Sequence, residues 1–82
     1  DGEGEFIKIF VPLGRRSGVR PGDLVGAIAN EARIDANSIG TIDITDNFSL
    51  VEVREQDADT VIEALRRTTI RGLKVKARRE RF

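Results

Sequence analysis

Apolar side chains recur along this chain with two different spacings. They alternate with polar side chains, the pattern of strands that bury one face, over residues 6–11, 39–45, 48–54 and 73–78. They return every three or four residues, as on one face of a helix, from Leu24 to Ala32 and from Ala58 to Leu65. The pattern therefore predicts six elements in the order β-α-β-β-α-β.

Proline and aspartate mark where several of these elements begin and end. Pro12 has no backbone N–H to donate, so the first strand should end there. Pro21 and Asp23 suit the first turn of a helix, because proline fixes a helical φ and an acid faces the positive end of the helix dipole. Asp57 or Asp59 should cap the second helix.

Three turns are expected from residues that favour them. Asp46 and Asn47 both tolerate left-handed backbone, so they predict a tight hairpin turn between the second and third strands. Residues 35–38 predict another turn. Gly72 should allow the bend into the last strand.

This element order predicts an α+β fold, the ferredoxin-like sandwich in which two helices cover one face of a four-stranded antiparallel sheet. The other face of the sheet stays open. The first and third strands are central neighbours in this topology, so Phe10 and Phe48 should lie side by side on the open face. The expected core consists of Val19, Leu24, Ile28, Ile42, Val51, Val53, Val61, Ile62, Leu65 and Val75.

Both phenylalanines lie in stretches that resemble RNA-recognition motifs. Residues 46–53 line up with the RNP1 pattern K/R-G-F/Y-G/A-F-V-x-F/Y, with Phe48 on its first aromatic position. Leu50 replaces the second aromatic, and the basic residue and the glycine of the pattern are also replaced. Residues 9–14 resemble the partner RNP2 strand, with Phe10 as its aromatic. The two stretches predict a platform for bases.

Two exposed phenylalanines on a sheet indicate that this face binds a partner. Fully burying a Phe side chain is worth about 1.5–3 kcal/mol, which is lost while the ring stays exposed. A base stacked on an aromatic ring contributes about 1–3 kcal/mol, so RNA can supply the missing contact. The alternatives are a protein-binding patch, or a sheet face that the terminal Phe82 covers.

The zero formal net charge of the chain conceals a strong asymmetry. Fourteen basic residues balance 14 acidic ones, yet the segment from Arg66 to Phe82 carries eight basic residues against Glu80 alone. Its net charge is therefore +7, and the segment from Asp1 to Leu65 carries −7. Such asymmetry is typical of contact with a nucleic acid or a membrane surface. The alternative is a solvated basic tail.

The basic side chains are expected on two sides of the aromatic platform. Lys74, Lys76 and Arg78 should alternate along the last strand, and Arg15, Arg16 and Arg20 lie in a loop at one end of the sheet. With Lys8 and Arg79 they are the candidate phosphate-binding residues. Asp43 and Glu52 on the same face should confine binding to the loops and to the half of the sheet formed by the first and last strands. Lysines on an edge strand also prevent aggregation, which is a compatible alternative.

Several classes of function are disfavoured by the residues that are missing. The chain has no Cys and no His, so thiolate metal sites and the commonest general base are absent. The P-loop pattern G-x-x-x-x-G-K-[ST] is absent too, and we expect neither catalysis nor a cofactor. No apolar run has membrane-span length, so we expect a soluble, cytoplasmic protein. Residues 1–5 are expected to be a linker remnant, residues 6–78 the domain and residues 79–82 a basic tail.

The run from Val11 to Ile28, VPLGRRSGVRPGDLVGAI, resembles the DbpA/CsdA-type RNA-binding domain of bacterial DEAD-box RNA helicases. Further family-like pieces follow in order: IG-x-IDI from Ile39, DNFS with VEV from Asp46, and IRG from Ile70. The resemblance covers residues 6–78. It implies an RRM-like fold, RNA binding, and an upstream helicase core that hydrolyses ATP and separates short duplexes.

The resemblance also implies a role for the parent protein and for some residues. Members act in ribosome assembly and cold adaptation, where the domain anchors the helicase core to structured, possibly ribosomal, RNA. The positions that match are Phe10 and Phe48 on the sheet, with Arg15, Arg16 and Arg20 in the loop. The expected partners are RNA and the helicase core of the same chain, with no membrane. The alternative is a protein–protein or dimerisation module that uses the open sheet face.

Overall fold

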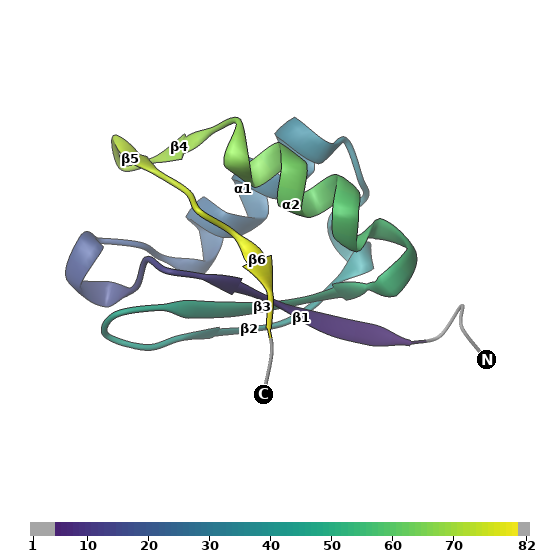
Figure 1. Cartoon of the computed structure of the whole chain (residues 1–82), viewed down its shortest axis with the longest axis horizontal. Helices are drawn as coiled ribbons and strands as arrows, with labels where there is room; N and C mark the ends of the chain where they lie inside the picture. The colour runs from purple at the N-terminus through teal and green to yellow at the C-terminus, as the bar shows by residue number, and fades with distance from the viewer. Residues whose placement is uncertain (1–4, 81–82) are drawn as a thin grey trace.

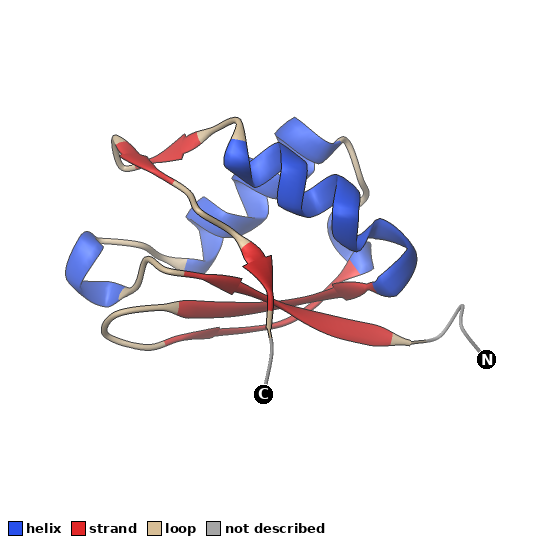
Figure 2. Ribbon diagram, viewed as in Figure 1, coloured by secondary structure: helices blue, strands red, loops and turns tan. Residues whose placement is uncertain are grey.

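The computed structural model describes residues 5–80, which form two layers (Figures 1 and 2). One layer is an antiparallel sheet whose strands lie in the order β2 (Ile39–Ile44), β3 (Ser49–Arg54), β1 (Phe6–Val11) and β6 (Arg78–Arg79). The other layer contains α1 (Pro21–Ala32) and α2 (Ala58–Arg66), on the same face of the sheet. The predicted RRM-like fold is confirmed, including the central pairing of β1 with β3.

The core fills the space between the two layers. Ile9 and Val11 of β1 and Val51 and Val53 of β3 are fully buried beneath the helices, as the alternation predicts. Each such side chain contributes about 1.5–3 kcal/mol when it leaves water. The helices supply Leu24, Ile28, Val61, Ile62 and Leu65, all buried. Of the ten predicted core residues, Ile42 alone is only partly buried, because β2 is an edge strand.

The first helix begins where the sequence predicts and the second begins without the predicted cap. The backbone N–H of Arg20 donates to Asp23 Oδ2 at 3.0 Å, just before Pro21. At α2, Asp57 is the N-cap residue but its side chain makes no capping hydrogen bond. Asp59 instead pairs with Arg79 of β6, so the predicted aspartate cap is wrong. Within residues 5–80, no helix has the length and apolar character needed to cross a membrane.

The β2–β3 connection is a tight turn, though not through left-handed residues. Among residues 5–80, the non-glycine residues with positive φ are Arg33 and Arg71, so the conformation predicted for Asp46 and Asn47 is wrong. The turn is closed by Thr45 instead, whose backbone N–H donates to the Phe48 carbonyl at 2.8 Å. The N–H of Phe48 donates to Thr45 Oγ1 at 3.2 Å. Phe48 therefore lies at the turn, immediately before β3.

The predicted last strand is broken into two pieces. β5 (Leu73–Lys74) pairs with β4 (Thr69–Ile70) in a small hairpin apart from the main sheet, and β6 alone pairs with β1. Where β1 pairs with β6, Ile9 lies opposite Arg79 and Phe10 lies opposite Arg78. If this pairing continued along the chain, Pro12 would lie opposite Lys76. Proline has no N–H for the ladder, which explains why the pairing stops.

The hairpin that replaces the first half of that strand turns at Arg71 and Gly72. Both have positive φ, 54° and 77°, and Gly72 thus provides the predicted bend. The alternation over residues 73–78 would put Leu73 on the buried face of the last strand, but its side chain is 41% exposed, because it belongs to the hairpin. Val75 and Ala77 are buried as expected. Residues 1–4, 81 and 82, which include most of the predicted linker and the candidate cover Phe82, lie outside the described residues.

Candidate nucleic-acid interface

The open face of the sheet carries a stacked aromatic pair. The ring centroids of Phe10 and Phe48 are 5.3 Å apart, with 24° between the ring planes. The guanidinium carbon of Arg78 lies 4.3 Å from the centre of the Phe10 ring. Because β1 lies between β3 and β6, Phe10 is flanked by Phe48 on one side and by Arg78 on the other. A base that stacks on Phe10 must therefore displace this guanidinium or stack upon it.

A third aromatic lies farther along the same face. Phe6 is 43% exposed, and the guanidinium carbon of Arg54 lies 5.2 Å from the centre of its ring. Phe6 is four residues from Phe10 on β1, so about 13 Å separates them and Lys8 lies between. Phe6, Lys8 and Phe10 alternate with the buried positions of β1, so all three lie on the open face.

Carboxylates occupy the β2–β3 side of the open face. Glu52 lies opposite Lys8 in the sheet, and its Oε1 accepts the backbone N–H of Thr41 at 3.0 Å. Asp43 lies opposite Leu50. The register therefore confirms that both acids share the face with the phenylalanines, so phosphates are disfavoured over β2 and β3.

A basic loop is held rigidly at the end of the sheet beside Phe48. Its short 3-10 helix η2 (Arg15–Ser17) follows Gly14, whose Cα approaches the β2–β3 turn so closely that a Cβ would lie 2.3 Å from the Thr45 carbonyl oxygen. The N–H of Arg15 donates to that oxygen at 2.8 Å, and the N–H of Arg16 donates to the Asp46 carbonyl at 3.0 Å. Two backbone hydrogen bonds thus fix the loop while both arginine side chains remain exposed.

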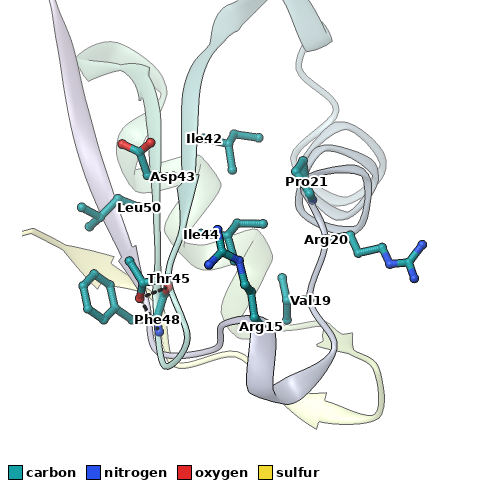
Figure 3. Close-up of a pocket in the computed structure, with 10 residues that line it drawn as sticks. All are labelled: Arg15, Val19, Arg20, Pro21, Ile42, Asp43, Ile44, Thr45, Phe48 and Leu50. Carbon is teal, nitrogen blue, oxygen red and sulfur yellow. Dashed lines mark hydrogen bonds between the residues drawn. The ribbon is translucent and has the colours of Figure 1, made fainter.

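An open groove of about 720 Å³ joins this loop to the open face (Figure 3). Leu50 and Phe48 lie on one side of the β2–β3 hairpin, and Ile42 and Ile44 point to the other side, towards the start of α1. The remaining lining residues are Arg15, Val19, Arg20, Pro21, Asp43 and Thr45. The groove therefore has an apolar floor with cations at its rim, which suits a polymer of flat bases on an anionic backbone.

Three predicted phosphate ligands do not lie on the open face. Arg79 lies opposite the inward-facing Ile9, so its side chain points to the helix layer. There it donates to Asp59 Oδ1 at 3.1 Å and lies 3.8 Å from a Glu55 carboxylate oxygen. Lys74 belongs to the β4–β5 hairpin, and Lys76 is in the segment between β5 and β6. The strand-edge placement predicted for the two lysines is wrong, because the last strand is broken.

Arg71, one of the eight basic residues from Arg66 to Phe82, was not predicted to join the interface but lies at this end of the molecule. Its Nε donates to Asp23 Oδ2 at 3.2 Å, which ties the β4–β5 turn to the start of α1. The backbone hydrogen bond from Arg20 lowers the pKa of Asp23 despite opposing desolvation, and the hydrogen bond and charge of Arg71 lower it further. No sequence signal pairs residues 48 positions apart, so only the fold reveals this contact.

Comparison with known proteins places the chain in a family. Residues 8–79 match the sequence model of the DbpA RNA-binding domain. The chain belongs to the DbpA RNA-binding domain family. The match includes Phe10, Phe48 and the basic loop, as well as Arg71 and both pieces of the broken strand.

Two helicases are among the relatives of the chain. It is 32% identical over 72 residues to the ATP-dependent RNA helicase DbpA of Bacillus subtilis, and 37% identical over 68 residues to the ATP-dependent RNA helicase DeaD of Mycobacterium tuberculosis. These alignments cover 88% and 83% of this chain, but only 15% and 12% of the two helicases.

A third relative is an uncharacterized protein of Treponema pallidum, 30% identical over 69 residues, which are 84% of this chain and 30% of that protein. The chain thus spans less than a third of each of these relatives.

Proposed function

We propose that this domain binds RNA, with bases stacked at the Phe10–Phe48 pair and phosphates held by Arg15, Arg16 and Arg20. The observation that carries the proposal is the groove that joins Phe48, one ring of the stacked aromatic pair, to a backbone-fixed basic loop. A base on an aromatic ring contributes about 1–3 kcal/mol, and each neutralised phosphate adds salt-dependent affinity. The loop is held in place before RNA arrives, so less ordering entropy opposes binding.

In this proposal the other candidate residues differ in how directly they contact the RNA. Arg78 and Lys8 flank the aromatic pair on the open face and reach bases or phosphates there. Arg79 supports the interface indirectly, since its ion pairs with Glu55, just before α2, and with Asp59 of α2 secure β6 beside β1. Lys74 and Lys76 contact only RNA that extends beyond the open face towards the hairpin.

In the parent protein, we propose that the domain attaches a DEAD-box helicase core to its RNA. The two helicase relatives support this assignment, and ATP hydrolysis would reside in that core. A binding module tethered to a core raises the local concentration of the core near its target. The proposal includes structured, possibly ribosomal, RNA as the target, roles in ribosome assembly and cold adaptation, and a cytoplasmic location, all from the family resemblance.

The test is RNA affinity after removal of the aromatic faces. The double variant Phe10→Leu/Phe48→Leu keeps apolar bulk at both positions and loses both rings. We expect binding of a labelled single strand to weaken by roughly 2–6 kcal/mol if a base stacks on each ring. Phe6→Leu is the matched control on the same strand, and it should change affinity little. Full-strength binding by a folded double variant would rule out stacking at this pair.

A further inference from the structure

A second cleft lies beside the groove, on the side of the domain away from the open sheet face. It measures about 380 Å³ and is lined by Arg15, Gly18, Val19, Arg20 and Arg71. The three arginines come from η2, from the residue before α1 and from the β4–β5 turn. Segments far apart in the sequence therefore bring three guanidinium groups to one hollow.

The local charge of this cleft is positive. None of its five lining residues is acidic. The nearest bonded carboxylate, Asp23, already accepts the backbone N–H of Arg20 and the Nε–H of Arg71 through a single oxygen, Oδ2. Arg15 lies 3.9 Å from Asp46, with both side chains more than 60% exposed, so this ion pair restrains it little. Three cations thus face two carboxylates, Asp23 and the loosely paired Asp46, so positive charge remains in excess and an anion is the ligand that the cleft fits.

Arg71 is held towards the cleft by its backbone as well as by its ion pair. Its φ of 54° is unusual for a residue with a side chain, and Gly72 follows with a φ of 77°. The β4–β5 pairing closes this turn, and the bond to Asp23 anchors it to α1. Arg71 keeps about half of its side chain exposed while it is anchored. Its remaining guanidinium donors can therefore serve a ligand.

The cleft and the groove are continuous, because Arg15, Val19 and Arg20 line both. Figure 3 shows Arg20 extending away from the apolar floor formed by Ile42 and Ile44. A strand whose bases lie at Phe48 thus reaches the cleft by passing Arg15.

We propose that Arg15, Arg20 and Arg71 form a phosphate-binding site for the RNA backbone. The RNA then turns around the end of the domain, from the open sheet face to the β4–β5 hairpin. Guanidinium groups suit this ligand because their planar donors can pair with two phosphate oxygens at once. The inference rests on the RNA binding proposed above. It adds Arg71 to the binding residues and gives the path of the RNA across the domain.

The experiment compares Arg71→Gln with Arg33→Gln. Arg33 is also exposed and has a φ of 56°, but it lies at the opposite end of α1. Each protein is titrated into a labelled hairpin with single-stranded flanks and into a strand of about four nucleotides, which spans the aromatic pair alone. For the hairpin, we expect Arg71→Gln to weaken binding about three- to tenfold and to make the salt slope shallower by about one.

The controls distinguish loss of this phosphate-binding site from loss of RNA binding as a whole and from a structural effect of the substitution. Arg33→Gln should bind both RNAs as the wild type does, and Arg71→Gln should bind the short strand normally. Asp23→Asn breaks the same ion pair but frees Arg71, so it should bind the hairpin more tightly. Equal hairpin affinities for the two arginine variants, or weakening by Asp23→Asn as large as that by Arg71→Gln, would overturn the site. Failure of the wild type to bind either RNA would overturn the proposed function together with it.

Discussion

Replacing Gly14 with alanine tests whether the basic loop owes its position to its close approach to the β2–β3 turn. A Cβ at residue 14 would lie 2.3 Å from the Thr45 carbonyl oxygen and 2.7 Å from two atoms of Asp46. Cβ contacts are essentially never shorter than 3.0 Å, so the turn and the loop must separate by about 0.7 Å or more. That displacement stretches the hydrogen bonds that the N–H groups of Arg15 and Arg16 donate to this turn.

The expected loss of stability follows from these contacts. Each backbone hydrogen bond contributes about 1 kcal/mol, and forcing an extra carbon into a packed site costs about 1–3 kcal/mol. Gly14→Ala should therefore lower the free energy of unfolding by about 2–4 kcal/mol. A domain of this size has about 4–12 kcal/mol in total, so the loss is a large and readily measured fraction of its stability. Its RNA affinity should fall as well, because Arg15 and Arg16 move.

The assay is urea unfolding followed by far-UV circular dichroism, since the chain has no Trp or Tyr to report by fluorescence. Gly26→Ala is the matched control. Apart from the local backbone of α1, no atom lies within 4 Å of a Cβ at Gly26, in the middle of that helix, so this variant should gain up to about 1 kcal/mol. Stability and RNA affinity of Gly14→Ala within error of the wild type would refute the reasoning, because the loop would then not depend on this contact.

Three further changes have expected outcomes. Ser49→Ala should lower the free energy of unfolding by about 1–3 kcal/mol, because the buried Leu13 carbonyl loses the hydroxyl donor 2.7 Å away; urea unfolding would show no change if water replaced it. Asp23 has a lowered pKa in the folded state, so it stabilises the fold above its ordinary pKa of 3.8 and loses this effect as the pH falls further. Acid unfolding should therefore be shallower for Asp23→Asn below about pH 4, and identical curves would contradict this. Arg79→Gln breaks an ion pair with the exposed Asp59, so stability should fall by less than about 1 kcal/mol with little change in RNA affinity; a tenfold loss would mean that Arg79 contacts RNA.

The position of the aromatic pair could be predicted from the sequence. Alternation along residues 6–11 and 48–54 placed Phe10 and Phe48 on one face, and the element order made their strands neighbours. Both inferences depend on local periodicity and on a common topology, which short-range sequence patterns report well. Nine of the ten core residues predicted by the same reasoning are buried.

The basic residues of the C-terminal segment were harder to place, because their positions depend on pairing between distant segments. Alternation predicted one strand through Lys74 and Lys76, but the register with β1 would set Pro12 against Lys76. The proline was recognised as a stop for its own strand only. The side chain of Arg79 points towards the helices because its partner in the sheet, Ile9, faces the core. Periodicity within one strand does not fix the register between two strands, so the sequence did not reveal this orientation.

The contact of Arg71 with Asp23 shows the same limit for a side chain. Arg71 lies in a turn for which the sequence predicted only a bend at Gly72. Its partner, Asp23, is at the start of α1. A local pattern carries no information about such a pair, whereas the fold brings the two residues together. The arginine cleft could therefore be found only in the structure.

The measurement that tests the central claim most directly is an anisotropy titration of labelled RNA with the wild-type domain across a salt series. A hairpin with a 3′ overhang would be compared with a plain single strand. We predict binding to RNA whose log K falls with log salt at a slope of about −4 for the single strand, if six basic groups meet phosphates. Absence of binding at low salt and tens of micromolar protein would contradict RNA recognition and favour a protein partner for the open face.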